Sequence, residues 1–380
     1  MKKFLILFLT VFLLTSCINA KQLERMYYIH VIGIDYVDGL YVAYAQLLNF
    51  ATIARGEAGG GGGEQHEAIV GKGVGETVDT AVHNLYHSTA QRIFWGHLAA
   101  VVLSDAAIEQ EIAESLDLLL RYHEIRYTLW LFTTNEPLED LLATFPVLEA
   151  SPVLGTLGNP TDSYAQSSFI PPIRMHRFIS DLNEPGKTAF APHLTIDKEQ
   201  WFDGKELFPA IHMDGVSLLT NKKYKGTLTD LDVVGFRWLQ DTTERAPIVI
   251  NHKGEPASVV MMENPDAQIT PIVEGSSVQF DIEVEVKGNV IQMMDSVSLE
   301  LIEEQAQQVI ENEIRKTFEK GLEIYADIYR LSYAFYQNNP EVWRKLTENE
   351  ELPLTKESLK DITVKVKIHN AGKNKLRPLQ

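Results

Sequence analysis

The chain has 380 residues, of which 45% are hydrophobic and 23% are charged, and its formal net charge at pH 7 is −18. This composition is that of a globular protein and excludes a disordered stalk. The negative charge disfavours nucleic acid and adsorption onto anionic lipid, because both repel an acidic protein. The single cysteine excludes an internal disulfide and a thiolate zinc site within the chain.

The first 17 residues have the pattern of a lipoprotein signal peptide. Lys2 and Lys3 precede an apolar run over residues 4–14, and Leu14-Thr15-Ser16-Cys17 ends it. The run is far shorter than the roughly 20 residues that cross a bilayer. We therefore predict that 1–16 is a cleaved signal peptide and that the Cys17 thiol accepts diacylglycerol, with palmitate among the attached acyl chains.

Two alternatives compete with this interpretation of the N-terminus. An ordinary secretory signal would need an A-x-A cleavage site, and none lies near Cys17. A retained anchor helix is opposed by the short apolar run and by the polar residues Asn19, Lys21 and Arg25.

Strands and helices alternate in the next 130 residues. Hydrophobic periodicity predicts strands at 26–34, 40–50, 66–71, 98–103 and 127–133, and helices at 76–89, 106–122 and 137–145. Five consecutive glycines at 59–63 predict a mobile loop tip, and the Pro/Gly/Ser-rich stretch 151–172 predicts a linker or a long surface loop. This alternation predicts an N-terminal α/β-type domain over 17–190.

The remaining chain is expected to form two further domains. Short strands near 192–196, 210–219 and 227–234 predict a middle domain over 191–250. Strands at 248–251, 257–262, 268–273 and 278–286, a long helix from Asp295 and a strand at 362–368 predict a C-terminal α+β domain over 251–372. The helix carries an apolar stripe that should lie on the terminal sheet, formed by Leu299, Ile302, Ala306, Val309, Ile314, Phe318, Leu322, Tyr325 and Ile328. The fold class is therefore α+β, multi-domain, with mixed or antiparallel sheets.

Two local patterns are compatible with a ligand site. Gly71-Lys72-Gly73-Val74-Gly75 lies between a strand and a helix, but its third glycine comes one residue too early for a dinucleotide fingerprint, so a flexible turn is favoured. Asp79, His83 and His87 recur every fourth residue, with His97 nearby, and this spacing permits a metal site. The favoured interpretation is an amphipathic helix whose histidines are at the surface or half-buried.

Motifs of enzymatic chemistry are missing from the sequence. There is no G-x-S-x-G elbow, no phosphate-binding loop and no nucleophilic cysteine motif. The acidic pairs Glu303-Glu304 and Glu350-Glu351 fall on predicted solvent faces, where charge serves solubility. We predict a protein that is not an enzyme and has no cofactor, metal or catalytic residue.

Several stretches together resemble the Ger(x)C family of spore germination lipoproteins, the C-type subunits of nutrient germinant receptors. In chain order they are Cys17, Gln22 to Met26, Val31 to Asp35, Gly73 to Ala81, Phe94 to Leu98, Arg121 to Arg126, and Ile310 to Trp343 with Asp327 and the turn Asn339-Pro340-Glu341-Val342-Trp343. The succession covers nearly the whole chain. It departs from the family pattern at Ile18-Asn19, where the family usually has Trp-Asp.

The resemblance implies a subunit that is lipid-anchored on the exported face of the spore inner membrane. It implies A-type and multi-spanning B-type membrane subunits as partners, action by contact, and no catalytic residue to carry over. The alternative function is a substrate-binding lipoprotein of an uptake system, although its two similar lobes would need a β/α pattern that the C-terminal third does not repeat. A cell-envelope hydrolase would need a nucleophile or metal signature.

The same stretches also have a purely structural interpretation. Trp95 and His97 could pack at a strand entrance, and Arg121 could form a local ion-pair set with Glu124 and Arg126 at a helix end. Asp327 could cap a helix or pair inside a domain. We expect most of these residues to be structural.

Overall fold

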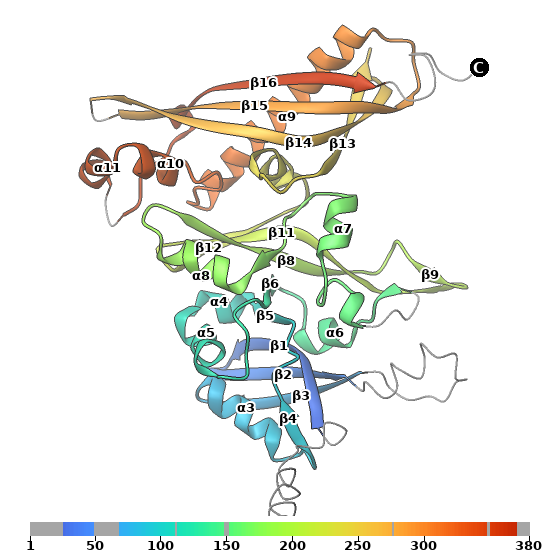
Figure 1. Ribbon diagram of the computed structural model, residues 1–380, viewed down its shortest axis with the longest axis vertical. Coiled ribbons are helices and arrows are strands. Elements are labelled where there is room, and N and C mark those ends of the chain that lie inside the picture. The colour runs from blue at the N-terminus through green and yellow to red at the C-terminus, as the bar shows by residue number, and fades with distance from the viewer. Residues whose placement is uncertain are drawn as a thin grey trace, which may run out of the picture.

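The computed structural model of the chain describes residues 26–48, 68–110, 112–147, 152–275, 277–347 and 350–370. The predicted signal peptide, Cys17, the glycine run at 59–63 and the basic tail after 370 lie outside these residues. The described part is elongated, with a large sheet spread along the long axis and a smaller sheet at the C-terminal end (Figure 1).

The large sheet contains ten strands in the order β12-β11-β8-β6-β5-β1-β2-β3, with β4 beside β1 and β7 beside β6. Its central strands β8, β6, β5 and β1 are mutually parallel. All five residues of β5 are buried, which explains its continuous apolar run, because a central parallel strand is covered on both faces. The strands are β1 (Met26–Val37), β2 (Leu40–Leu48), β3 (Ala68–Gly75), β4 (Arg92–Phe94), β5 (Ala100–Ser104), β6 (Trp130–Thr134), β7 (Ile173–Arg174), β8 (Thr188–Asp197), β11 (Ala210–Thr220) and β12 (Lys223–Thr229).

Helices cover both faces of this sheet. Ile32 and Ile34 of β1 belong to one apolar cluster with α3, α4, α5 and α8, whereas Val31 belongs to a second cluster with α6. The predicted helix at 106–122 is divided into α4 and α5, and the predicted loop 151–172 contains the short helix α7. The helices are α3 (Val78–Tyr86), α4 (Asp105–Glu109), α5 (Ile112–Arg121), α6 (Leu138–Ala143), the 3₁₀ turn η4 (Pro152–Leu154), α7 (Thr161–Gln166) and α8 (Met175–Asn183).

The segment 191–250 differs from the expected separate middle domain. The boundary between 190 and 191 falls inside β8, which pairs in parallel with β6 of the N-terminal part. Strands β11 and β12 then extend the same sheet, because β11 pairs with β8 and β12 pairs with β11. A small hairpin of β9 (Phe202–Asp203) and β10 (Glu206–Leu207) lies outside it.

The C-terminal unit is a four-stranded sheet in the order β13-β14-β15-β16 with one long helix, α9, on its face. Strand β16 pairs with β15 in parallel and the other pairs are antiparallel, and the two strands predicted at 257–262 and 268–273 form one long strand. This confirms the predicted α+β class with a long helix on the terminal sheet. The elements are β13 (Arg245–His252), β14 (Glu255–Glu274), β15 (Ser277–Met293), α9 (Leu299–Glu323), α10 (Leu331–Asn338), α11 (Pro340–Leu346), η7 (Lys356–Ser358) and β16 (Leu359–Asn370).

Helix α9 buries Ile302, Ala306, Ile314 and Phe318 as the stripe predicts, but the stripe is wrong at its end. The helix stops at Glu323, so Tyr325 lies outside it and is 85% exposed. Among the described residues, no helix has the length and apolar character needed to cross a membrane.

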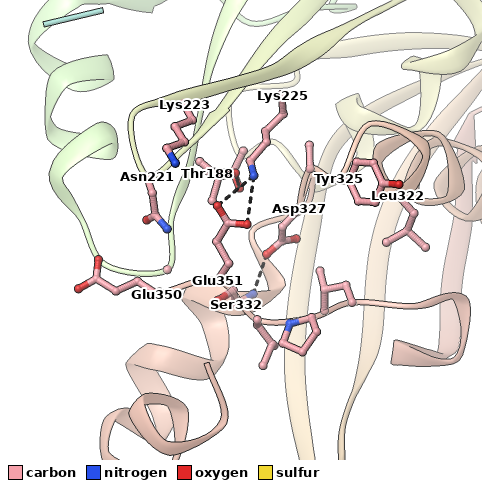
Figure 2. Close-up of a pocket in the computed structure, with 16 residues that line it drawn as sticks. Thr188, Asn221, Lys223, Lys225, Leu322, Tyr325, Asp327, Ser332, Glu350 and Glu351 are labelled. Carbon is pink, nitrogen blue, oxygen red and sulfur yellow. Dashed lines mark hydrogen bonds and ion pairs between the residues drawn. The ribbon is translucent and has the colours of Figure 1, made fainter. Parts of the chain in front are cut away.

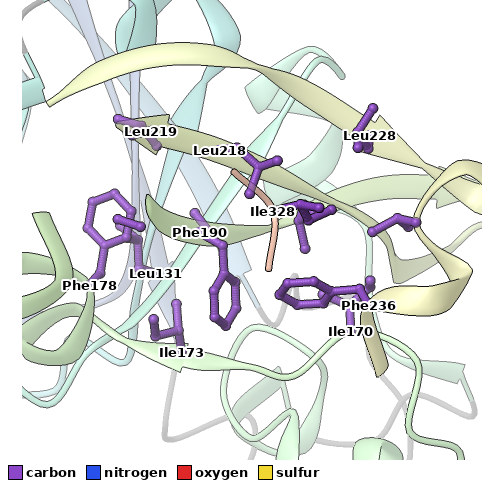
Figure 3. Close-up of a cluster of buried hydrophobic side chains, with 14 of the residues drawn as sticks. Leu131, Ile170, Ile173, Phe178, Phe190, Leu218, Leu219, Leu228, Phe236 and Ile328 are labelled. Carbon is purple, nitrogen blue, oxygen red and sulfur yellow. The ribbon is translucent and has the colours of Figure 1, made fainter. Parts of the chain in front are cut away.

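The two sheets are joined through the 3₁₀ segment η6 (Val234–Leu239), which follows η5 (Asp230–Asp232). The Phe236 ring meets Phe190 of β8 edge to face, with 5.1 Å between centroids, while Trp238 donates its indole N–H to Glu313 of α9 at 2.7 Å. Figure 3 shows Phe190, Phe236 and Ile328 meeting in one apolar cluster. The two halves therefore share one continuous core.

Replacing Phe318 by Ala should lower the free energy of unfolding by about 3 to 5 kcal/mol, because its ring is 1% exposed and stacks near Tyr329. Urea denaturation followed by circular dichroism measures this loss. The matched control is Glu304→Ala on the exposed side of the same helix, which should stay within about 0.5 kcal/mol of the wild type. A loss below about 1 kcal/mol for Phe318→Ala would contradict the packing described.

Candidate functional site

A cleft with a volume of about 630 Å³ lies where the edge of the large sheet meets the C-terminal unit (Figure 2). Four stretches of the chain form its walls. They contribute Gly186 and Thr188 at the start of β8, Thr220, Asn221, Lys223 and Lys225 of the β11–β12 hairpin, Leu322, Tyr325, Ala326, Asp327 and Ser332 from the end of α9 to the start of α10, and Glu350, Glu351, Leu352, Pro353 and Leu354.

The β11–β12 hairpin presents two lysines to this cleft. Its two-residue turn has Asn221 and Lys222 at φ of 50° and 64°, the left-handed geometry that fits the twist of a tight hairpin. Lys223 and Lys225 both line the cleft, and the pairing of β11 with β12 shifts at Lys225, which is the extra residue of a bulge. Lys225 Nζ contacts both carboxylate oxygens of Glu351, at 2.9 and 3.0 Å, and this ion pair spans the cleft.

The opposite rim is shaped by the way in which α9 ends. Ala326 N–H donates to the carbonyl of Gly321 at 2.9 Å and Tyr325 N–H donates to that of Leu322 at 3.1 Å, which is the Schellman pattern. Glycine usually occupies the left-handed position of this motif, but here Tyr325 does, at φ 55°. An aromatic residue in this conformation is strained, and such strain is typical of functional positions. The rim therefore holds a strained, exposed tyrosine.

Asp327 lies on the wall below Tyr325 and caps α10. Its carboxylate accepts hydrogen bonds from the backbone N–H groups of Leu331 and Ser332, at 2.9 and 2.7 Å. Loss of hydration nevertheless raises the pKa of Asp327 to about 6, against the opposing effects of these bonds and of Arg330. The structural interpretation of Asp327 as a cap is therefore correct.

Ion pairs fix the back of the cleft. Arg330 contacts Asp181 of α8 at 2.8 Å and donates from Nε to the carbonyl of Thr188 at 3.0 Å, and Lys187 contacts the other oxygen of Asp181 at 2.7 Å. These groups come from both halves of the chain, so the two walls are held at a fixed separation.

The residues of the possible metal site, Asp79 and His83, lie on α3, which packs on the large sheet far from the cleft (Figure 1). His83 Nδ1 lies 3.9 Å from Asp79 Oδ2, and both side chains are mostly exposed. His97 packs instead against the rings of Tyr28 and Phe94. Within the described residues, no three His, Cys, Asp or Glu side chains are grouped to hold a metal ion.

The glycine-rich stretch 71–75 belongs to β3 itself rather than to a turn. A Cβ atom at Gly73 would lie 2.1 Å from the Ala81 carbonyl oxygen, so the glycines allow α3 to lie directly against the strand.

Glu124 pairs with Arg92 at 2.7 Å, whereas Arg121 pairs with Asp117 of its own helix. Arg121 and Glu124 therefore do not pair with each other as expected, because each has a different partner.

The sequence did not point to the cleft. Its residues come from segments up to 168 positions apart, Gly186 to Leu354, and only the part with Asp327 belongs to a stretch that resembles the family. The arrangement offers charged and hydroxyl groups beside an aromatic rim, which suits binding by contact. The lysine–glutamate pair and the capping carboxylate already have structural partners.

Replacing Asp327 by Asn should change how stability depends on pH. The folded pKa of about 6 lies above the unfolded value near 3.8, so the contribution of this carboxyl is complete below pH 3.8 and is lost as pH rises through 6. The amide does not titrate, and its single oxygen can still accept one of the two N–H groups. Between pH 4 and 7, the unfolding free energy of the variant should therefore gain about 1 to 3 kcal/mol relative to the wild type.

Urea titrations at each pH measure this difference. The exposed substitution Asp79→Asn serves as the control and should show a much smaller change with pH. Parallel curves for Asp327→Asn and the wild type would show that hydration of this carboxyl is intact in the fold.

Comparisons with known proteins cover both halves of the chain. Residues 19–196 match the family described as spore germination protein N-terminal domain, and residues 214–372 match spore germination B3/GerAC-like, C-terminal. Spore germination protein KC of Bacillus subtilis (strain 168) is 24% identical over 95% of this chain and 92% of its own, and spore germination protein YndF of the same organism is 22% identical over 87% and 81%.

The solved structure entitled Crystal Structure of the GerBC protein shares the fold. It aligns with a TM-score of 0.54 and 16% identity over 89% of this chain and 96% of that one. The resemblance read from the sequence is confirmed by these matches, which follow the same order along the chain. The chain belongs to the GerAC-like family of spore germination proteins.

Proposed function

We propose that this protein is a membrane-anchored, non-enzymatic subunit of a spore germinant receptor, needed for the response of spores to nutrient germinants. The observation that carries the proposal is the match of two spore germination domains, in order, over residues 19–196 and 214–372. Relatives named as spore germination proteins align over most of their own length, 92% for protein KC. The similarity to these relatives therefore extends over nearly the whole chain rather than over a single domain.

The proposed anchor is a lipid on Cys17, which places the mature chain on the exported face of the spore inner membrane. Leu14-Thr15-Ser16-Cys17 supports this, because it ends a short apolar run after two lysines. A net charge of −18 disfavours electrostatic adsorption onto anionic lipid, so acyl chains would supply the attachment. Stable anchoring takes two such chains or more.

The proposed partners are the A-type and B-type membrane subunits of the receptor, bound by contact. The cleft supports a contact role, because Lys225, Glu351 and Asp327 are already engaged in ion pairs and capping. Tyr325, whose backbone is in the strained left-handed conformation, presents an exposed aromatic ring at the rim, and tyrosine is enriched at binding hot spots.

The substrate-binding lipoprotein of an uptake system is disfavoured by the topology. Such a protein would have two lobes of similar β/α pattern. Here a ten-stranded mixed sheet stands beside a four-stranded sheet with one long helix. We therefore propose the receptor subunit alone.

Substituting Cys17 by Ala should block acylation and leave the precursor uncleaved at that site, because the thiol is the acceptor. Spores are grown with a labelled fatty acid and the chain is isolated from inner membranes. The expected result is loss of label and of membrane association, with a large fall in germination by nutrient. The control Lys21→Ala, which keeps the cysteine, should be labelled normally. Undiminished labelling of Cys17→Ala would refute the anchor.

Substituting Tyr325 by Gly separates contact from stability. Glycine relieves the left-handed strain, so the free energy of unfolding should be unchanged or rise by up to about 1 kcal/mol. If the ring contacts a partner, nutrient germination should nevertheless slow at normal protein abundance, as immunoblots of spore membranes beside germination rates would show. Leu231→Ala, at a side chain 70% exposed and outside the cleft, should leave germination unchanged. Normal germination of Tyr325→Gly would exclude this ring from the contact.

A further inference from the structure

A second cavity, separate from the cleft and from the proposed function, lies between the large sheet and the segment 152–163. Its volume is about 270 Å³, close to the lower end of the range of roughly 300 to 1,000 Å³ found for ligand pockets. His30 and Gln46 form its floor, Leu157 and Trp201 are among its apolar walls, and Asp162 is an exposed wall residue.

His30 is placed here by a β-bulge. The pairing of β1 with β2 shifts between Ile29 and Val31, so His30 is the extra residue of the strand. Bulges redirect side chains and are common beside functional sites. The His30 side chain is buried, at 3% exposure, and its buried polar neighbour on β2 is Gln46, at 2%.

The hydrogen bonds of His30 define its tautomer. Gln46 donates from Nε2 to the carbonyl of Leu142 at 2.7 Å, so its Oε1 is the acceptor that lies 2.8 Å from His30 Nδ1. His30 Nδ1 therefore carries the proton. Burial lowers the pKa of His30, which keeps the ring neutral and leaves Nε2 as a hydrogen-bond acceptor.

His30 Nε2 is buried and has no hydrogen-bond partner in the described part of the chain. Leaving such an atom unpaired costs about 1 to 3 kcal/mol, and native proteins rarely do so without a reason. His30 lines the cavity, although Nε2 itself is covered by neighbouring atoms. A guest in the cavity that donates a hydrogen bond would satisfy this atom once the ring tilts towards it.

The other polar groups of the cavity narrow the class of guest. The hydroxyls of Thr144, Thr156 and Ser163 already donate to backbone carbonyls. Asp162 forms no ion pair within the described residues, and Trp201 is half exposed at 50%. A carboxylate, an aromatic face and a neutral imidazole acceptor all favour a cation that carries N–H donors.

We propose that this cavity binds a small organic ammonium ion with a short apolar chain. One of its N–H groups donates to His30 Nε2, the carboxylate of Asp162 attracts its charge, and its chain lies against Leu157 and the other apolar walls. The acidity of the whole protein adds a general attraction for cations.

The proposal is tested on the intact chain with three probes of equal chain length: n-butylammonium, 1-butanol and butyrate. Saturation-transfer difference NMR detects each probe, and ring carbon signals of ¹³C-labelled histidine report on His30. We expect saturable binding of n-butylammonium with a shift of the His30 signal, binding of 1-butanol at least threefold weaker, and none of butyrate. Equal binding of 1-butanol and n-butylammonium, or binding of butyrate, would overturn the proposal.

Two variants locate the site. His30→Phe keeps a ring but removes the acceptor, and it should abolish n-butylammonium binding while circular dichroism remains native. Asp162→Asn lies at an exposed position and should not disturb folding. It should weaken the binding of n-butylammonium by two- to fivefold and leave the binding of 1-butanol unchanged. Asp79→Asn removes an equally exposed carboxylate elsewhere and should have no effect. If His30→Phe does not fold, Asp162→Asn decides alone, and unchanged affinity in it would refute the site.

Discussion

The arrangement of the molecule depends on the contact between η6 and α9. Glu313 of the helix accepts hydrogen bonds from Trp238 at 2.7 Å and Arg237 at 3.0 Å, and these charge-assisted bonds offset the cost of burying the carboxylate. Gly235 permits the approach, because a Cβ there would lie 2.2 Å from the Glu313 carbonyl oxygen. With Phe236 inserted on the other side into the large sheet, the joint sets the distance between the two halves. The cleft exists because this distance is fixed.

Much of the fold follows from local sequence patterns. The continuous apolar strand β5 and the stripe from Ile302 to Phe318 have periods that report burial directly, so strand, helix and buried face were predictable. The prediction of a separate middle domain was wrong, because β8 pairs with β6, about sixty positions earlier. No local pattern in residues 188–229 indicates this pairing. Strand pairing is a long-range property that periodicity does not contain.

The candidate sites were less predictable than the fold. Tyr325 continues the spacing of the helical stripe, and the glycine that usually marks a helix end is absent. The Schellman turn at the end of α9 could therefore not be predicted from the sequence. His30 lies in an apolar strand, where the sequence does not reveal a bulge or an unpaired nitrogen. In both cases the backbone geometry, rather than the residue type, gives the side chain its role. The family, in contrast, was recognisable because its motifs occur in a fixed order.

The most direct test of the account is photo-cross-linking in spores from a photoreactive amino acid placed at position 325. If the protein is a contact subunit that uses the cleft rim, irradiation should link it to an A-type or B-type receptor subunit in the inner membrane. The same group at position 231, exposed but outside the cleft, should give little of this product. The absence of both subunits from the product at 325, with the chain folded and present in the membrane, would contradict the account.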